Sequence, residues 1–219
     1  MNIRTPQRLV LAACAAVLMT SALTACIPLV AGGVAGGALL AADRRTSGAQ
    51  LEDEGIELRA LSRIRSNIGE RVHVNLTSYN RQVLLTGEVP NAQDKAAVEQ
   101  IVSKVENVSG VVNDLEVASA STLGQRSSDT LVTGRVKAAL IDARDLQFNA
   151  FKVVTERGVV YLMGRVTQRE ADRATAVARA ITDVQKVVRV FEIISEAELA
   201  RLQPAPAKAP VTEAKPALN

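Results

Sequence analysis

The sequence has few of the residues that build metal and catalytic centres. Its 219 residues include one histidine, two cysteines and no tryptophan, with only two tyrosines and three phenylalanines. Zinc sites are built mainly from cysteine and histidine, so a site of that kind is excluded. Because large aromatic side chains are rare, the core has to be built mainly from Val, Ile, Leu and Ala.

Motifs of catalysis and nucleotide binding are also missing. The sequence contains no G-x-S-x-G, G-x-G-x-x-G or Walker A pattern, the signatures of serine hydrolases and of nucleotide-binding loops. His73 falls in a predicted strand, where a histidine is usually packed or solvated, and the carboxylates fall on predicted helix surfaces and turns. We predict that the protein is not an enzyme, has no catalytic residue, metal or cofactor, and binds no nucleic acid.

The first 26 residues have the order of a secretory signal. A basic start, an apolar run over 9–25 and small residues before Cys26 follow one another, as in cleaved signal peptides. The ending Leu23-Thr24-Ala25-Cys26 resembles the lipobox of bacterial lipoproteins. That resemblance implies cleavage before Cys26, whose sulfur then carries a diacylglycerol and whose amine carries an acyl chain such as palmitate. A 17-residue transmembrane helix is the alternative, at the lower edge of spanning length. A second match, ending at Cys14, leaves almost no apolar run after Arg8.

The residues after Cys26 bear on the location. Cys26 is followed by Ile27 and Pro28. Enterobacterial lipoproteins that stay in the inner membrane have Asp at the position of Ile27. We therefore expect a lipid anchor in the outer membrane, on its periplasmic face. Loss of residues 1–25 lowers the formal net charge from +3 to +1, because two arginines leave with them. It also leaves no free thiol, so the fold does not depend on a disulfide.

The chain contains two copies of one unit. Residues 83–117 and 160–193 align with one residue dropped in the turn, so that Gly87 matches Gly164. Upstream, Asp53 matches Asp129, and apolar residues recur after both at helical spacing. We interpret the two aspartates as N-caps or first-turn acids. The two glycines indicate a positive φ or a close backbone approach rather than a site.

Each copy is predicted to run helix, strand, strand, helix, strand. The fold class is α+β, and the economical packing is a small three-stranded mixed sheet with two helices on one face. After a first helix around Asp53, the first copy has strands 72–79, 83–89 and 110–117 and a helix over 91–105. The second has helices 129–143 and 168–181 and strands 148–155, 159–166 and 186–194.

This αββαβ unit resembles the BON domain, and the stretch 153–173 carries the most specific match. Two such units behind a lipobox resemble the dual-BON outer-membrane lipoproteins of the DolP type. We predict a signal peptide (1–25), a lipidated Gly/Ala-rich stalk (26–50), a first BON domain (51–118), a linker (119–127), a second BON domain (128–195) and a disordered Pro/Ala/Lys tail (196–219).

The two copies differ in charge. Residues 52–118 hold seven basic and eleven acidic side chains, whereas residues 127–194 hold eleven basic and eight acidic ones. Anionic membrane surfaces attract Lys and Arg. On the helix 129–143, a face beside the core stripe combines apolar and basic residues, the pattern of interfacial membrane contact. The predicted lipid-binding residues are Leu131, Gly134, Arg135, Lys137, Ala138 and Ile141.

The family resemblance implies the same surface. In DolP-type proteins the second BON unit is associated with anionic phospholipid such as phosphatidylglycerol, with a role in envelope integrity and enrichment at the division site. Three alternatives stay open. Leu131 and Ile141 could pack against the first copy. The protein could be a periplasmic adaptor that recruits an envelope-assembly or peptidoglycan-remodelling protein. A soluble stress-induced BON protein is the third, and the lipobox argues against it.

Overall fold

The computed structural model describes residues 43–202. The predicted signal peptide, the lipidation site Cys26, residues 26–42 of the stalk and residues 203–219 of the tail lie outside the described residues. No helix within residues 43–202 combines the length and the hydropathy that a membrane span requires.

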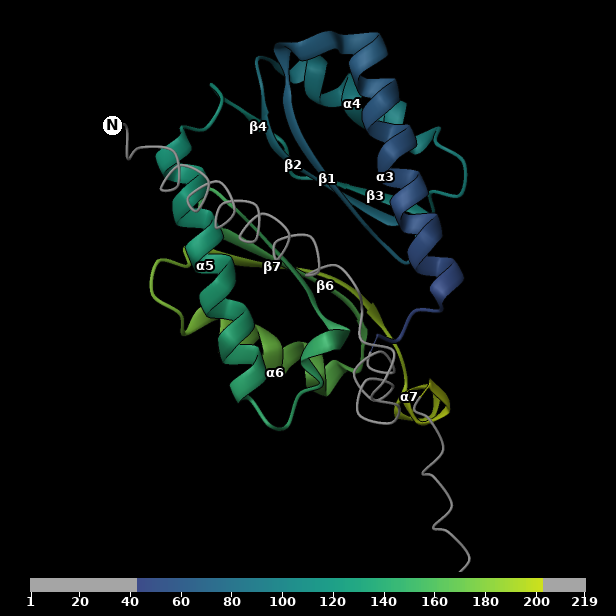
Figure 1. Cartoon of the computed structure of the whole chain (residues 1–219), viewed down its shortest axis with the longest axis vertical. Coiled ribbons are helices and arrows are strands. Elements are labelled where there is room, and N and C mark those ends of the chain that lie inside the picture. The colour runs from purple at the N-terminus through teal and green to yellow at the C-terminus, as the bar shows by residue number, and fades with distance from the viewer. Residues whose placement is uncertain (1–42, 203–219) are drawn as a thin grey trace, which may run out of the picture. The chain divides into compact units, whose positions relative to one another are not determined.

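The first repeat is a helix, a hairpin, a second helix and a parallel return strand. Strand β2 pairs antiparallel with β1 and parallel with β3 and β4. Figure 1 shows α3 and α4 on the same side of this sheet. In chain order the elements are α3 (Ser47–Ile68), η2 (Gly69–Arg71), β1 (His73–Tyr79), β2 (Gln82–Val89), α4 (Ala92–Ser103), β3 (Gly110–Asn113) and β4 (Glu116–Val117).

The second repeat has the same order. Strand β6 pairs antiparallel with β5 and parallel with β7, and α5 and α6 cover one side of the sheet. The elements are α5 (Leu123–Asp142), η3 (Phe148–Ala150), β5 (Lys152–Glu156), β6 (Val159–Val166), α6 (Gln168–Arg179), β7 (Lys186–Ile193) and α7 (Glu196–Leu202). The predicted α+β class with two tandem αββαβ units is confirmed.

Each repeat has its own aliphatic core between its helices and its sheet. In the first, the inner stripe of α3 packs on alternate residues of β1 and β2; this core includes Ile56, Ala60, Ile64, Leu76, Val83 and Leu85. In the second, α5 packs in the same way, and the core includes Val132, Val136, Leu140, Val153, Val160 and Leu162. Residues three to four apart on the helices and two apart on the strands share one face, and these faces form the two cores.

Gly87 and Gly164 have the structural reason that the sequence indicates. Gly87 has φ of 107°, in the region that favours glycine. A Cβ on Gly87 would collide with the carbonyl oxygen of His73, and a Cβ on Gly164 would collide with that of Ala150. The close approach of two backbones therefore accounts for both glycines.

The prediction that Asp53 and Asp129 begin their helices is wrong. The helices start six residues earlier, where the hydroxyls of Thr46 and Thr122 accept N-cap hydrogen bonds. Both aspartates are buried in mid-helix. The Asp53 carboxylate accepts the backbone N–H groups of Asn80 and Arg81, each 2.7–2.8 Å away. Asp129 binds the second hairpin turn in the same way. Each carboxylate thus fixes the turn that follows the edge strand of its repeat.

Other element boundaries also differ from the prediction. Residues 148–150 form the 3₁₀ turn η3, and the strand predicted from 148 begins only at Lys152. The strand predicted over 110–117 is interrupted at Asp114 and Leu115, and Leu115 is buried in the core of the first repeat. Helices α3 and α5 begin inside the predicted stalk and linker.

The tail predicted as disordered from 196 begins with the helix α7. Leu199 is buried, the Ser195 hydroxyl accepts the backbone N–H of Glu198, and Glu198 pairs with Arg165 at 2.8 Å. The segment also carries a helical signal of its own, because Glu, Ala, Leu and Arg favour helices and follow a serine at the N-cap position; the Pro/Ala/Lys composition of the whole tail hides it.

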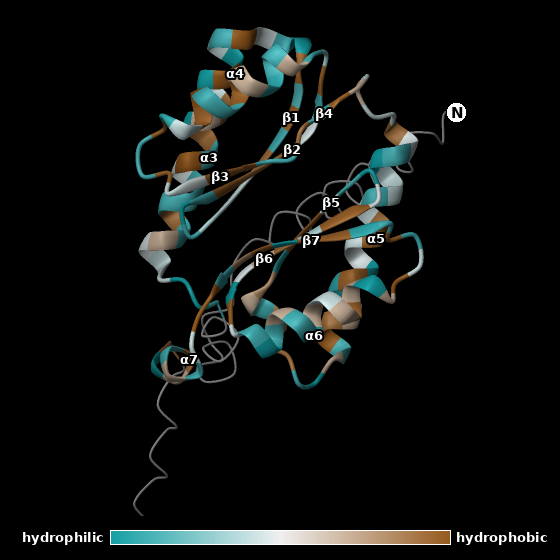
Figure 2. Ribbon diagram, turned by 180° about the vertical axis from the view of Figure 1, so that it is seen from behind, coloured by the Kyte–Doolittle hydropathy of each residue, from teal (hydrophilic) through white to brown (hydrophobic). Residues whose placement is uncertain are grey.

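The two sheets pack on each other through the faces that their helices leave open. A third apolar cluster joins strands of both repeats: Tyr79, Leu84, Tyr161, Met163 and Val190. Polar pairs surround it, including Asn75 with Glu156 at 2.6 Å and Tyr161 with Asp114 at 2.7 Å. Figure 2 shows the strands of both repeats between the two helix pairs. The outer sides of the helices are therefore not used for the contact between the repeats.

Candidate lipid-contact surface

Helix α5 has one face in the core and one in solvent. Thr122 and Gln125 form a capping box at its start, which satisfies free backbone N–H groups there. Val132, Val136 and Leu140 point into the core. The six predicted lipid-binding residues are all exposed, and we call them the α5 outer face: Leu131, Gly134, Arg135, Lys137, Ala138 and Ile141.

The apolar members of the α5 outer face do not pack against the first repeat. Leu131 is 62% exposed and Ile141 is 54% exposed. The alternative that these side chains form part of the contact between the repeats is therefore wrong, because the sheets make that contact. Single exposed apolar residues are common in soluble proteins, so their meaning depends on the charges around them.

The two cations of this face differ in whether a carboxylate pairs with them. Arg135 pairs with Asp183 at 2.7 Å, with both side chains about half exposed; such a pair contributes little to stability, and the carboxylate offsets the charge of Arg135. Lys137 and, beyond the helix end, Arg144 are also exposed. Within residues 43–202 no ion pair involves either of them. These two cations are available to an anionic ligand.

Two apolar residues near α5 were missed by sequence reasoning. Phe148, in η3, is 40% exposed, and Leu123, at the start of α5, is largely exposed. The sequence prediction places Phe148 at the start of the strand 148–155, whereas the structure places it in the turn η3. Leu123 was assigned to the linker. The only sequence signal is the polar stretch after Asp142, which marks the helix end but not the 3₁₀ turn.

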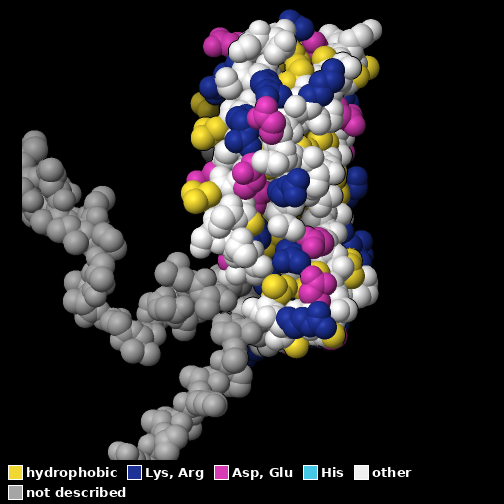
Figure 3. Space-filling model, turned by 90° about the vertical axis from the view of Figure 1, so that its right-hand side faces the viewer, with side chains coloured by type: hydrophobic (Ala, Val, Ile, Leu, Met, Phe, Trp, Pro, Cys, Tyr) yellow, Lys and Arg dark blue, Asp and Glu magenta, His cyan; other side chains and the backbone are white. Residues whose placement is uncertain are grey.

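The corresponding helix of the first repeat also exposes apolar residues. Leu51 and Leu58 lie in solvent on α3. Their neighbours in sequence include Glu52, Glu54 and Glu57, and Glu52 pairs with Arg59 at 2.6 Å. Apolar exposure therefore does not distinguish the two repeats, but the sign of the charge beside it does. Figure 3 shows one side of the molecule on which charges of both signs are interspersed with scattered apolar spots.

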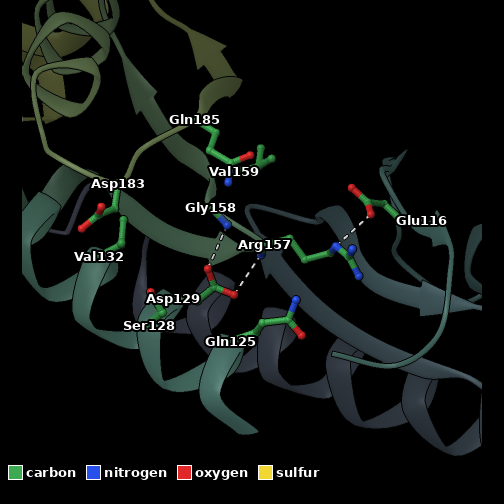
Figure 4. Close-up of a pocket in the computed structure, with 10 residues that line it drawn as sticks. All are labelled: Glu116, Gln125, Ser128, Asp129, Val132, Arg157, Gly158, Val159, Asp183 and Gln185. Carbon is green, nitrogen blue, oxygen red and sulfur yellow. Dashed lines mark hydrogen bonds and ion pairs between the residues drawn. The ribbon is translucent and has the colours of Figure 1, made fainter. Parts of the chain in front are cut away.

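A polar cavity of about 680 Å³ lies where the second hairpin meets α5 and β4. Figure 4 shows Asp129 accepting the backbone N–H groups of Arg157 and Gly158, and Arg157 reaching Glu116. Arg157 also pairs with Glu88 at 3.4 Å. These groups satisfy one another across the two repeats, which makes the cavity part of the contact between them. Within residues 43–202 no three His, Cys, Asp or Glu side chains are grouped as metal ligands.

His73 belongs to the same polar layer. Its Nδ1 atom lies 2.8 Å from Oε2 of Glu88, which is almost fully buried. Burial opposes ionisation of Glu88, but hydrogen bonds from His73, the Ser121 backbone and Arg157 outweigh it and lower its pKa. For Glu156, burial dominates and raises the pKa, with the nearby charges of Glu88 and Asp129 adding to the effect. Burial and hydrogen bonding are the two opposing causes.

Known proteins resemble this chain over most of its length. The BON domain matches twice, at residues 53–119 and 128–195. The outer membrane lipoprotein DolP of Haemophilus influenzae is 36% identical over 174 residues, which cover 78% of this chain and 90% of that protein. The 21 kDa hemolysin of Actinobacillus pleuropneumoniae is 29% identical over 154 residues, covering 69% and 79%.

The similarity to solved structures is weaker. The C-terminal domain of CdsD, a structural protein of the Type III secretion system of Chlamydia trachomatis, aligns with 62% of this chain and 97% of its own, at 14% identity and a TM-score of 0.28.

Proposed function

The chain belongs to the DolP-type outer-membrane lipoproteins with two BON domains, and from this membership we propose that it binds anionic phospholipid through the α5 outer face. Its envelope role would then rest on lipid contact rather than on catalysis. Phosphatidylglycerol is the expected class of ligand, and enrichment at the division site is the expected consequence in the cell. Acylation of Cys26 would supply the permanent anchor on the periplasmic face.

One observation carries the proposal. All six residues of the α5 outer face are exposed, on a helix whose opposite side is fully packed in the core. Exposed Leu131 and Ile141 can enter the interface of a bilayer, and Lys137 can meet a phosphate. Burying apolar area is worth about 25 cal/mol per Å², and each Lys or Arg near an anionic leaflet adds about 1 kcal/mol. Such a surface binds a membrane weakly by itself, but this affinity is sufficient when a lipid anchor already holds the protein at the bilayer.

The first repeat is expected to take no part in this contact. Beside Leu51 and Leu58 on its helix α3, Glu54 is exposed and has no ion-pair partner within residues 43–202, so it repels an anionic surface, whereas Glu52 and Glu57 are offset by Arg59 and Lys152. The excess of acidic over basic side chains in residues 52–118 has the same effect. The two repeats thus have different tasks, although they share one fold.

Vesicle flotation of the fragment 43–219 tests the proposal without the anchor. This fragment contains the cores of both repeats. We expect it to float with phosphatidylglycerol-rich vesicles at low salt, less at high salt because screening shortens electrostatic attraction, and not with zwitterionic vesicles. The combined change Leu131→Ala, Arg135→Glu and Lys137→Glu should abolish flotation.

The matched control carries the same change of charge on the first repeat. Leu58→Ala, Arg65→Glu and Lys104→Glu alter three exposed side chains and should bind almost as well as the unchanged fragment. Equal loss in both variants would mean that only net charge matters. Failure of the unchanged fragment to float at either salt would refute the proposal and favour an adaptor that captures an envelope protein.

A further inference from the structure

An apolar pocket opens beside the C-terminal half of α5. It lies between this helix, the turn η3 and the edge strand β5, and its volume is about 270 Å³. We call it the α5–η3 pocket. Its lining consists of Lys137, Leu140, Ile141, Phe148, Asn149, Phe151 and Val153.

The pocket connects the core of the second repeat with the exposed surface. Leu140, Phe151 and Val153 are buried members of that core and form its floor. Ile141 and Phe148 are about half exposed and form its rim. An open hollow with such walls leaves apolar area in contact with water, which is unfavourable. The walls therefore favour an apolar occupant that is narrow enough to reach the floor.

The charged side chains at the mouth of the pocket indicate which polar group the occupant carries at its other end. Lys137 belongs to the lining itself, one turn before Ile141, and residues four apart on a helix are neighbours. Arg144, two residues after the end of α5, is exposed. Asn149 is the only other polar residue of the lining. An apolar slot with a cation at its mouth fits a molecule with an apolar chain and an anionic head.

The equivalent place in the first repeat lacks these features. Because Leu140 matches Ile64 along the two helices, Lys137 corresponds to Leu61, which packs on the core, and Ile141 corresponds to Arg65. Phe148 corresponds to Arg71, which pairs with Asp94 at 2.8 Å. The apolar rim with its cation is thus a feature of the second repeat alone.

We propose that the α5–η3 pocket binds one acyl chain of an anionic phospholipid, with Lys137 at its phosphate. This inference rests on the proposed function and makes it more specific. The α5 outer face would then be the rim of a lipid site with a defined stoichiometry, and one chain would leave the bilayer interior to enter the protein. Binding should saturate at one lipid per protein, and should need both the chain and the anionic head.

Methyl NMR of the fragment 43–219 tests this with a monomeric probe. We would titrate decanoyl lysophosphatidylglycerol below its critical micelle concentration, and glycerophosphoglycerol as the headgroup alone. The lysolipid should give saturable shifts of the Leu140 and Val153 methyl groups on the floor, and the headgroup alone should not. The change Ile141→Asp, at an exposed rim position, should weaken lysolipid binding at least tenfold. Leu58→Asp on α3 is the matched control and should leave the affinity unchanged.

The outcomes separate this inference from the proposed function. Flotation with anionic vesicles, but no shift of the Val153 methyl by lysolipid, would mean that chains do not enter the pocket, and would overturn the inference alone. Floor shifts that Ile141→Asp leaves undiminished would also overturn it. Absence of both flotation and floor shifts would overturn the inference and the proposed function together.

Discussion

Arg44 and Glu170 form an ion pair at 2.7 Å in which both side chains are only 4% exposed. Arg44 precedes the first repeat, and Glu170 lies in α6 of the second. The same guanidinium also donates to the backbone carbonyl of Arg165 at 2.8 Å. Its neighbour Arg45 pairs with Asp53 and lies 4.3 Å over the ring of Tyr79. Two consecutive arginines thus hold the entering chain to both repeats.

Loss of this pair should destabilise the protein strongly. Arg44→Ala leaves the carboxylate of Glu170 buried without its partner, which typically costs about 3–5 kcal/mol. Urea unfolding of the fragment 43–219 measures the free energy of unfolding. Arg169→Ala is the control, because Arg169 reaches Glu196 at 4.0 Å across an exposed surface. Equal midpoints for the two variants would contradict the structural role of Arg44.

Asp129 should matter for stability although it lies mid-helix. Asp129→Ala leaves the backbone N–H groups of Arg157 and Gly158 without their acceptor. Each unsatisfied donor costs about 1–3 kcal/mol, so we expect a loss of at least about 2 kcal/mol in urea unfolding. Asp142→Ala, at the exposed end of the same helix, should change little. A loss no larger than that of Asp142→Ala would refute the hairpin contact.

The raised pKa of Glu156 predicts a pH dependence of stability. A carboxyl whose pKa is higher in the folded state than in the unfolded state contributes its stability below the unfolded value, and that contribution is lost as the pH rises through the folded value. Glu156→Gln keeps an oxygen for the amide of Asn75 but carries no charge. We expect this variant to be more stable than the parent at pH 7.5 and to lose the advantage near pH 4.

Unfolding in urea at several pH values checks this prediction. Glu54→Gln, on the exposed side of α3, controls for the general loss of one negative charge. If Glu156→Gln is less stable than the parent at pH 7.5, the ionised carboxylate stabilises the protein at this position. That result would contradict a raised pKa of Glu156.

Asp183 should act as a brake on lipid binding. Asp183→Asn removes the carboxylate that pairs with Arg135 and leaves its charge free for the membrane. Asn suits the left-handed backbone of this position, φ 73°. At about 1 kcal/mol per cation near the surface, binding to anionic vesicles should tighten about fivefold. Glu52→Gln, which releases Arg59 on α3 of the first repeat in the same way, is the control away from the α5 outer face. Unchanged or weaker binding by Asp183→Asn would contradict the role of Arg135.

Much of the fold can be predicted from the periodic spacing of apolar residues. The helical spacing of Val132, Val136 and Leu140 indicates both faces of α5 correctly, because one face has to be buried. The packing of sheet on sheet was missed, yet β2 and β6 carry a signal for it. The run Val159–Met163 is apolar without alternation, which is typical of strands buried on both faces.

Other features have no local signal. Nothing in the sequence around Arg44 shows that its partner lies at Glu170, since that contact exists only in the folded chain. The α5–η3 pocket depends on where the helix ends and on the 3₁₀ turn that carries Phe148. Element boundaries are the part of a fold that a sequence predicts least well, because tertiary context overrides local propensity. Sequence periodicity therefore gives the exposed face of α5 but not the hollow at its end.

The absence of tryptophan makes the central claim directly measurable. Leu131→Trp in the fragment 43–219 places a single tryptophan on the α5 outer face, and Leu58→Trp places one at the comparably exposed position on α3. With phosphatidylglycerol-rich vesicles, we expect the emission of Leu131→Trp to shift to the blue and to be quenched by brominated acyl chains, while that of Leu58→Trp stays as in water. Unshifted emission from Leu131→Trp, or equal shifts from both variants, would contradict lipid contact through α5.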